Sequence, residues 1–196
     1  MTSLRHNNDD TLLDAARDAI LAVGWRRTTL TDISRRAGVS RMTIYRRWPD
    51  MQTLLADLMT REWSGVVEDA ALTEAATVRD RLAGGIAATV AALRHNELFL
   101  KILTVDPELL LPYLLDRRGR TQDALLALVE AAVAEGQAEG SVRSGDPRLL
   151  SRSLLLATHG FALSAQTMAG DPGDPGPSDT ELAGELRALV ERYLRP

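Results

Sequence analysis

Apolar residues recur along the chain at intervals of three and four positions, and no segment shows the apolar-polar alternation of a half-buried strand. This spacing predicts a first helix over 9–24, two short helices over 29–38 and 41–47, and a long amphipathic helix over 50–69. Further helices are predicted over 75–94, 96–104, 107–116, 119–138, 147–169 and 179–194. The predicted fold class is therefore all-α.

Several predicted helix ends carry residues that stop or cap a helix. Gly24 is a typical C-terminal stop, and Ser40 can cap the helix that begins at residue 41. Pro49 closes that helix, because the residue before a proline avoids helical geometry. The run 171–179, rich in Asp, Pro and Gly, predicts a flexible surface connection, with a functional loop as the alternative. These ends predict a small N-terminal domain that shares the long helix with a larger C-terminal bundle.

The composition is that of a soluble globular protein. The 196 residues are 45% apolar and 26% charged, and they suffice for one large domain or two small ones. The absence of cysteine excludes a disulfide framework, a cysteine-ligated zinc site and a thiol nucleophile. The longest uncharged stretches, 82–93 and 153–170, do not qualify as membrane spans, and the N-terminus is unlike a signal peptide. We therefore expect a cytoplasmic protein with no membrane partner.

Positive charge is concentrated in one part of the chain, although the formal net charge is −4. Residues 26–47 hold seven arginines and one acid, whereas the rest of the chain is net acidic. Such a cationic block suits a polyanion, because each neutralised phosphate releases condensed counterions. The alternative is a solvated face whose arginines pair with acids elsewhere, and charge alone does not decide between the two.

Residues 28–48 have the pattern of two short helices joined by a turn that contains glycine. Ile33 is predicted to face inward from the first of these helices, with the small Ser34 at the point where the helices cross. Gly38 can adopt the left-handed conformation that the turn needs, and Ile44 packs the second helix back onto the first. The second helix is short enough to enter a DNA major groove and directs its polar side chains outward.

The outward side chains have the chemistry of DNA contacts. Arg41 can donate two hydrogen bonds to a guanine edge, and Thr43 can contact a thymine methyl group or a phosphate. Later residues fit phosphate and sugar contacts, while the threonines at the preceding helix N-terminus favour a phosphate. The predicted DNA-binding residues are Thr29, Thr31, Arg41, Met42, Thr43, Tyr45, Arg46, Arg47 and Trp48. The alternative is a helical pair inside an enzyme, with the tyrosine and the tryptophan belonging to its core.

The run TTLTDISRRAGVS over 28–40, followed by Tyr45, Trp48 and Leu54, resembles the N-terminal domain of TetR-type transcriptional regulators. The specific resemblance covers roughly residues 9–60, and beyond it only the helix count and lengths agree. It implies a homodimeric, ligand-responsive DNA-binding protein, usually a repressor, that releases its operator when a small molecule binds. It further implies a helix-turn-helix DNA-binding domain at 1–60 and a ligand-binding and dimerisation domain at 61–196.

The sequence departs from the pattern of that family in three places. Met42 stands where the family commonly has glycine, and Arg47 with Trp48 replaces the usual Tyr-Phe or His-Phe pair. Met51 replaces a frequent lysine, which removes one phosphate contact. Because the first two changes lie at or near the groove, the operator sequence cannot be taken over from other members.

Two apolar helices of the C-terminal bundle predict a dimer. The helix over 149–168 is apolar on two sides, so one side can pack on its own bundle while the other needs a partner. The final helix adds a second stripe, and two such helices from each of two subunits make a four-helix interface. Burial in a monomer's own core is the alternative. The predicted interface residues are Leu150, Leu154, Ala157, Phe161, Leu186, Leu189 and Tyr193.

A small-molecule pocket in the bundle is predicted less specifically, because its lining has the same apolar spacing as core. A pocket of this composition suits an apolar or aromatic effector. His95 and His159 have no second metal ligand at helical spacing, so no metal site or cofactor is predicted. The candidate lining residues are Trp63, Leu82, Ile86, Val90, Phe99, Leu103, Leu110, Tyr113, Leu125, Val129, His159 and Leu163.

Two other functions remain as alternatives. An all-α enzyme would need a catalytic motif, and no Ser-His-Asp order, zinc-protease motif, phosphate-binding loop or paired catalytic carboxylate emerges from the sequence. A nonspecific nucleic-acid binder would use the same cationic block without preferring a palindrome. The leading hypothesis is a sequence-specific transcriptional regulator bound to double-stranded DNA.

Overall fold

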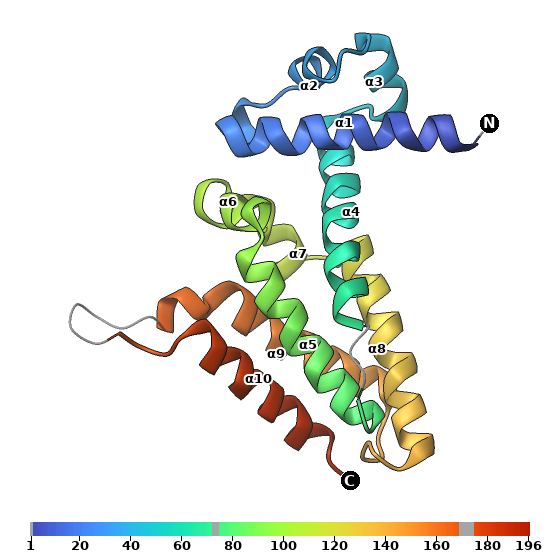
Figure 1. The fold of residues 1–196 in the computed structure, drawn as a ribbon, viewed down its shortest axis with the longest axis vertical. Helices are drawn as coiled ribbons and strands as arrows, with labels where there is room; N and C mark the ends of the chain where they lie inside the picture. The colour runs from blue at the N-terminus through green and yellow to red at the C-terminus, as the bar shows by residue number, and fades with distance from the viewer. Residues whose placement is uncertain (1, 72–74, 169–174) are drawn as a thin grey trace. The chain divides into compact units, whose positions relative to one another are not determined.

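The computed structural model describes residues 2–71, 75–168 and 175–196, with side chains described for 9–65, 75–168 and 175–196. Within these ranges the chain is helical and contains no strand, which confirms the all-α prediction. The helices run in the order shown in Figure 1: α1 Thr2–Val23, α2 Leu30–Arg36, α3 Arg41–Arg47, α4 Met51–Ala71, α5 Val78–His95, α6 Glu97–Val105, α7 Leu111–Leu115, α8 Arg120–Glu139, α9 Pro147–Ser164 and α10 Asp179–Leu194. Single 3-10 turns occur at Trp25–Arg27, Pro107–Leu109 and Ala165–Met168.

The helix boundaries agree with the predicted ones to within three residues except at three places. The first helix begins at Thr2, seven residues earlier than predicted. Apolar periodicity indicates a helix only from its first periodic residue onward, so the earlier turns were missed. The predicted helix 107–116 divides into a 3-10 turn and the five-residue α7, with Pro112 inside the first turn of α7, where a missing N–H is tolerated. Helix α9 ends at Ser164 and continues as a 3-10 turn to Met168. Residues 171–174 of the predicted connection 171–179 lie outside the described residues. Ser178, near the end of this connection, caps α10 with a capping box.

The chain forms two units, and each is described by itself. The first unit comprises residues 1–62 and 96–120, and the second unit comprises 63–95 and 121–196. The boundaries of these units therefore differ from those of the predicted functional domains, 1–60 and 61–196. Residues 96–120 join the first unit because the buried carboxylate of Asp106 accepts a hydrogen bond from the Trp25 backbone N–H at 2.9 Å. Arg26 also donates to Glu108 at 2.7 Å.

The core of the first unit is assembled from one apolar stripe of each helix. Helix α2 packs against both α1 and α3, and α6 packs against α1. The stripes have the 3.6-residue period read from the sequence, which places successive apolar side chains on one face. The most deeply buried residues of this core are Leu12, Ala16, Ile20, Ile33, Ile44, Trp48, Leu54, Leu58, Leu98 and Ile102.

The core of the second unit lies where α5 and α10 run side by side with α9 packed against both (Figure 1). Its buried residues come from α5, α8, α9 and α10 and include Val142 from the α8–α9 turn. Arg143, in the same turn, donates through Nε to the Tyr193 carbonyl at 2.8 Å, which ties this turn to the end of α10. The members of the cluster are Val78, Leu82, Ala83, Val90, Val133, Val142, Leu150, Leu154, Ala162, Leu186, Val190 and Leu194.

We expect Gly136→Ala to lower the free energy of unfolding by about 1–3 kcal/mol, because it adds a methyl group to a filled core. An added Cβ would lie 3.2 Å from the Val142 Cβ and 3.3 Å from the Val78 Cβ, and closer still to a Val142 methyl carbon. Valine is branched at Cβ and has little rotamer freedom with which to move aside. Urea denaturation followed by circular dichroism measures the change.

Gly84→Ala in α5 is the matched control, because no heavy atom lies within 4 Å of its added Cβ. A free helical position favours alanine over glycine, so this variant should gain roughly 0.5–1 kcal/mol. Equal effects of the two substitutions would contradict the packing described around Gly136.

Candidate functional site

Helices α2 and α3 are joined by a turn whose geometry matches the predicted motif. The Thr29 side chain accepts a hydrogen bond from the Asp32 N–H at 3.1 Å and caps α2, while its hydroxyl donates to the Asp32 carboxylate at 2.6 Å. That hydrogen bond, together with the charges of Arg35 and Arg36, lowers the pKa of Asp32. Gly38 has a φ of 68°, the left-handed conformation expected at this turn.

The side chains between the two helices fix their crossing. Ile33 and Ile44 are fully buried and pack the helices together, as predicted. Ser34 is also buried, and its hydroxyl donates to the Thr31 carbonyl at 2.9 Å, which satisfies a polar group at the crossing. Ser40 caps α3 by accepting from the Thr43 N–H at 3.2 Å. Helix α3 is therefore held by packing on one side and by the Ser40 cap at its N-terminus.

The opposite side of α3 is open and cationic. Arg41, Met42, Tyr45 and Arg46 are exposed, and Thr43 is half-exposed with its hydroxyl in a hydrogen bond to Ser40 at 2.9 Å. Among the described side chains, Arg41 and Arg46 make no ion pair, so their guanidinium groups keep their donors for a partner.

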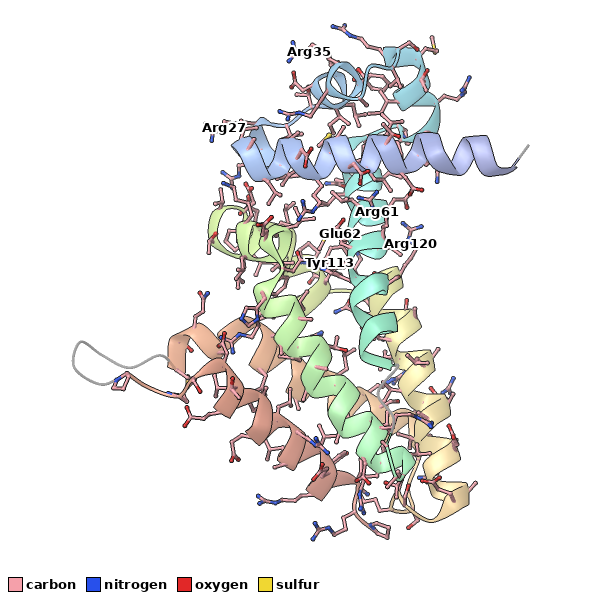
Figure 2. All side chains as sticks on the ribbon, in the orientation of Figure 1. Arg27, Arg35, Arg61, Glu62, Tyr113 and Arg120 are labelled. Atoms are coloured by element: carbon pink, nitrogen blue, oxygen red, sulfur yellow. The ribbon has the colours of Figure 1, made fainter. Side chains whose placement is uncertain are left out.

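Two further arginines of the first unit, Arg27 and Arg35, are exposed outside α3 (Figure 2). Arg35 on α2 is exposed and pairs with Asp32 at 2.8 Å. Arg27 is the last residue of the 3-10 turn after α1, and its Nε donates to the Val23 carbonyl at 2.8 Å. Thr29 is exposed and Thr31 half-buried, so both stay predicted phosphate contacts at the start of α2.

Trp48 is not a surface residue, and its predicted contact with DNA is wrong. Its side chain is 0% exposed, its backbone N–H donates to the Ile44 carbonyl, and its indole Nε1 donates to Asp57 Oδ2 at 2.8 Å. The four-residue spacing from Ile44 to Trp48 continues the inward stripe of α3, and this spacing is the signal that could have shown its burial. A side chain committed to the core has no surface left for a phosphate.

Arg47 lies at the edge of the cationic surface and is already partly engaged. Its Nε pairs with Asp9 at 3.0 Å, its Nη2 lies 3.5 Å from Asp57 Oδ2, and its guanidinium stacks 5.1 Å from the centre of the Trp48 ring. Half of the side chain remains exposed, so a phosphate contact by Arg47 remains a prediction.

A cavity of about 290 Å³ lies within the second unit. It is mostly apolar, with an ion pair between Arg81 and Glu135 at 2.6 Å in its lining. A cavity near this size and composition is typical of sites for small apolar ligands. The lining residues are Arg81, Leu82, Gly85, Ile86, Thr89, Leu125, Leu126, Leu128, Val129, Ala131, Ala132, Glu135, Ser151, Leu154, Leu155 and Thr158.

Four of the predicted pocket residues line this cavity: Leu82, Ile86, Leu125 and Val129. The remaining candidates do not. Phe99, Leu103, Leu110 and Tyr113 belong to the first unit, where Phe99 and Leu110 are buried. In the second unit Trp63, Val90, His159 and Leu163 lie outside the lining. The sequence missed the second face of α8, including Leu126 and Ala132, because lining and core positions have the same period.

His159 lies near the cavity lining without being part of it. Burial lowers the pKa of His159, and its Nε2 is 3.3 Å from the amide nitrogen of Gln122. In the described part of the chain no group of three or more His, Asp or Glu residues could hold a metal ion. No helix in the described ranges is long and apolar enough to cross a bilayer.

The exposed apolar face of the second unit differs from the predicted dimer interface. Leu150, Leu154 and Leu186 are buried in the core of their own unit, so these three predictions are wrong: a side chain packed there cannot reach a partner. Ala157, Leu189 and Tyr193 are exposed, and Phe161 is half-buried. The other side of α9 is the open one, with Leu149 and Leu156 both largely exposed. Because α9 is apolar on two sides, the sequence could not show which side faces inward.

Comparisons with known proteins agree on one family. The model of bacterial regulatory proteins of the tetR family matches residues 12–58. HTH-type transcriptional regulators from Mycobacterium bovis and Mycobacterium tuberculosis are each 34% identical to this chain over 197 residues, which covers 99% of this chain and 100% of theirs. The TetR-family repressor QsdR of R. erythropolis has a similar fold, with a TM-score of 0.66 and 15% identity over 97% of each chain.

Proposed function

Because the chain belongs to the TetR family of bacterial regulatory proteins, we propose that it is a homodimeric repressor released from a palindromic operator by a small effector. Members of this family are DNA-binding transcriptional regulators and not enzymes, and this holds for the chain. A DNA partner supports a cytoplasmic location. The observation that carries the proposal is the open cationic side of α3, held rigidly on its other side by Ile44 and Trp48.

In this proposal α3 is the recognition helix. Arg41, in its first turn, donates two hydrogen bonds to a guanine edge in the major groove, and Thr43 contacts a thymine methyl group. Tyr45 and Arg46 contact phosphates and sugars and set the register. Met42 is the most exposed apolar residue of the helix and packs on a base edge or sugar.

The exposed face of α9 and α10 serves as the dimer interface. Leu149, Leu156, Ala157, Leu189 and Tyr193 are exposed on these two helices. Two copies of this face form a four-helix interface with twofold symmetry. A symmetric dimer then reads two half-sites spaced by about 34 Å, one helical turn of DNA.

The cavity of the second unit is the proposed effector site. The hydroxyls of Thr89, Ser151 and Thr158 donate to carbonyls of their own helices at 2.8, 2.8 and 2.7 Å. The charges of Arg81 and Glu135 neutralise each other. The lining therefore offers apolar surface and few donors, which favours a small, apolar or aromatic effector without a net charge.

Selection of bound sequences from random DNA duplexes tests this function. A repressor should select a palindrome and prefer it to scrambled duplex by about 10³-fold or more at physiological salt. Repeating the titration with small apolar and aromatic compounds identifies an effector by release of the selected duplex. Equal binding to all duplexes would make the protein a nonspecific nucleic-acid binder.

Two arginines of α3 should respond differently to substitution. We expect Arg41→Ala to weaken binding to the selected duplex by about 1–3 kcal/mol and to relax the preference at one base pair. Arg46→Ala is the matched comparison. It should weaken binding to all sequences alike and reduce the salt dependence of binding by the equivalent of about one phosphate contact. Fluorescence anisotropy at several salt concentrations measures both. If both substitutions weakened selected and scrambled duplexes equally, the assignment of Arg41 to a base would be wrong.

A further inference from the structure

The carboxylate of Asp57 joins three side chains from different parts of the first unit. Asp57 lies on α4 and is only 17% exposed. Its Oδ2 accepts the Trp48 indole N–H at 2.8 Å and lies 3.5 Å from Arg47. Its Oδ1 accepts from the guanidinium of Arg120, which Figure 2 labels at the start of α8. Burial alone would raise the pKa of Asp57, but the hydrogen bonds from Arg120 and Trp48 and the charges of Arg120 and Arg47 lower it.

One oxygen of this carboxylate holds the C-terminal end of the recognition helix. Trp48 is the C-cap residue of α3, and Arg47 is the last residue of the helix. The indole N–H is the only donor of the tryptophan side chain, so its hydrogen bond to Asp57 fixes the orientation of the ring. The Arg47 guanidinium stacks on the same ring. The position of the last turn of α3 therefore depends on where Asp57 lies.

The other oxygen holds the first residue of α8. Arg120 begins a helix of 20 residues whose later turns carry Leu125, Leu126 and Val129 of the cavity lining. In the described part of the first unit, Arg47 also pairs with Asp9 of α1, whereas the ion pairs of Arg17 and Arg26 include no residue of α3.

We propose that Asp57 is a positioning residue that ties the end of the recognition helix to the first residue of the cavity-lining helix α8. The proposal rests on the proposed function for its DNA readout. An indole hydrogen bond to a carboxylate is also specific to tryptophan, since a phenylalanine at position 48 would fill the same space without a donor.

Removal of the Arg120 guanidinium tests the tether. We expect Arg120→Gln to lower the preference for the selected duplex over scrambled duplex by about 5- to 10-fold, a typical size for coupling between sites. The matched control is Arg117→Gln, which removes the same charge three residues away, where the guanidinium contacts the Tyr113 ring and not Asp57. Arg120→Lys keeps the charge and a donor and should restore most of the preference. Thermal unfolding confirms that each variant is folded.

A second readout does not depend on DNA. The indole N–H resonance of Trp48 in a nitrogen-15 spectrum is identified by its absence in Trp48→Phe, and it reports the hydrogen bond to Asp57. We expect this resonance to shift in Arg120→Gln and to stay in place in Arg117→Gln. In an Asp57→Asn background, Arg120→Gln should cause no further loss of DNA preference, because the tether is already cut.

The outcomes separate this proposal from the proposed function. Equal behaviour of Arg120→Gln and Arg117→Gln in both readouts would overturn the tether. A shifted indole resonance with an unchanged DNA preference would also overturn it, since the contact would then not position α3. If the unmodified protein preferred no sequence, the proposed repressor function would fail, and the indole resonance would still decide whether Arg120 acts on Trp48.

Discussion

Leu156→Glu should convert the proposed dimer into a monomer and weaken binding to the selected duplex by about 100- to 1,000-fold, the size expected for loss of an interface anchor. Leu156 is 72% exposed on α9, beside Leu149 and Ala157 and on a face that no described residue of its own unit covers. A carboxylate placed there must be desolvated without a partner if the two faces meet. Because each monomer contacts one half-site, loss of the dimer removes the joint binding of two grooves.

Sedimentation velocity measures the oligomeric state, and anisotropy measures binding to the duplex. Leu115→Glu is the matched control, because Leu115 is 76% exposed and lies on α7 in the first unit. It introduces the same charge at an equally exposed leucine and should leave the dimer and the binding within about twofold, as expected for a surface substitution. Dimerisation of Leu156→Glu at unchanged affinity would place the interface elsewhere on the molecule.

Trp48→Ala should lower the free energy of unfolding by about 3–5 kcal/mol, the range for truncating a large aromatic side chain in a core. The indole is fully buried, and its loss leaves a cavity and removes the hydrogen bond to Asp57 Oδ2. Domains of this size typically have a free energy of unfolding of about 5–15 kcal/mol, so the variant should lose a large part of its stability. Urea denaturation at constant protein concentration measures the loss, because a dimer's stability depends on concentration.

Trp48→Phe and Tyr45→Ala separate the contributions. The phenylalanine keeps most of the packing and loses the hydrogen bond, so it should cost about 1–3 kcal/mol. Tyr45 is a neighbouring aromatic residue whose side chain is exposed, and its truncation should change stability by less than about 0.5 kcal/mol. If Trp48→Ala instead kept full stability and lost only DNA affinity, the burial described for Trp48 would be wrong. The prediction that Trp48 contacts DNA would then be correct.

The sequence was most informative where a local pattern was enough. Helix α3 begins and ends at the predicted residues, because Ser40 supplies a cap and Pro49, nine positions later, a stop. The turn at Gly38 follows from the conformational freedom of one residue. The split of 107–116 was missed because its apolar residues keep helical spacing across Pro107 and Pro112, whose backbone effect outweighs that spacing.

The candidate site was less predictable where one residue has two possible environments. Trp48 follows two arginines and ends a cationic run, so it was assigned to DNA, although its spacing from Ile44 is that of a core residue. Leu150 and Leu156 are both apolar residues of α9, and only packing against α5 and α10 shows that the first is buried and the second exposed. Periodicity defines the faces of a helix and does not identify the neighbour of each face.

The sequence by itself determined the helical class, the helix-turn-helix with its caps and glycine, the cationic block at 26–47 and the family. These properties depend on residues close together in the chain, whose backbone preferences and charges act locally. Only the tertiary structure decided that Trp48 is core, that Asp57 joins Trp48, Arg47 and Arg120, and which side of α9 is open. These contacts join residues far apart in sequence, and burial of one face against another element is set by the packing of the whole unit.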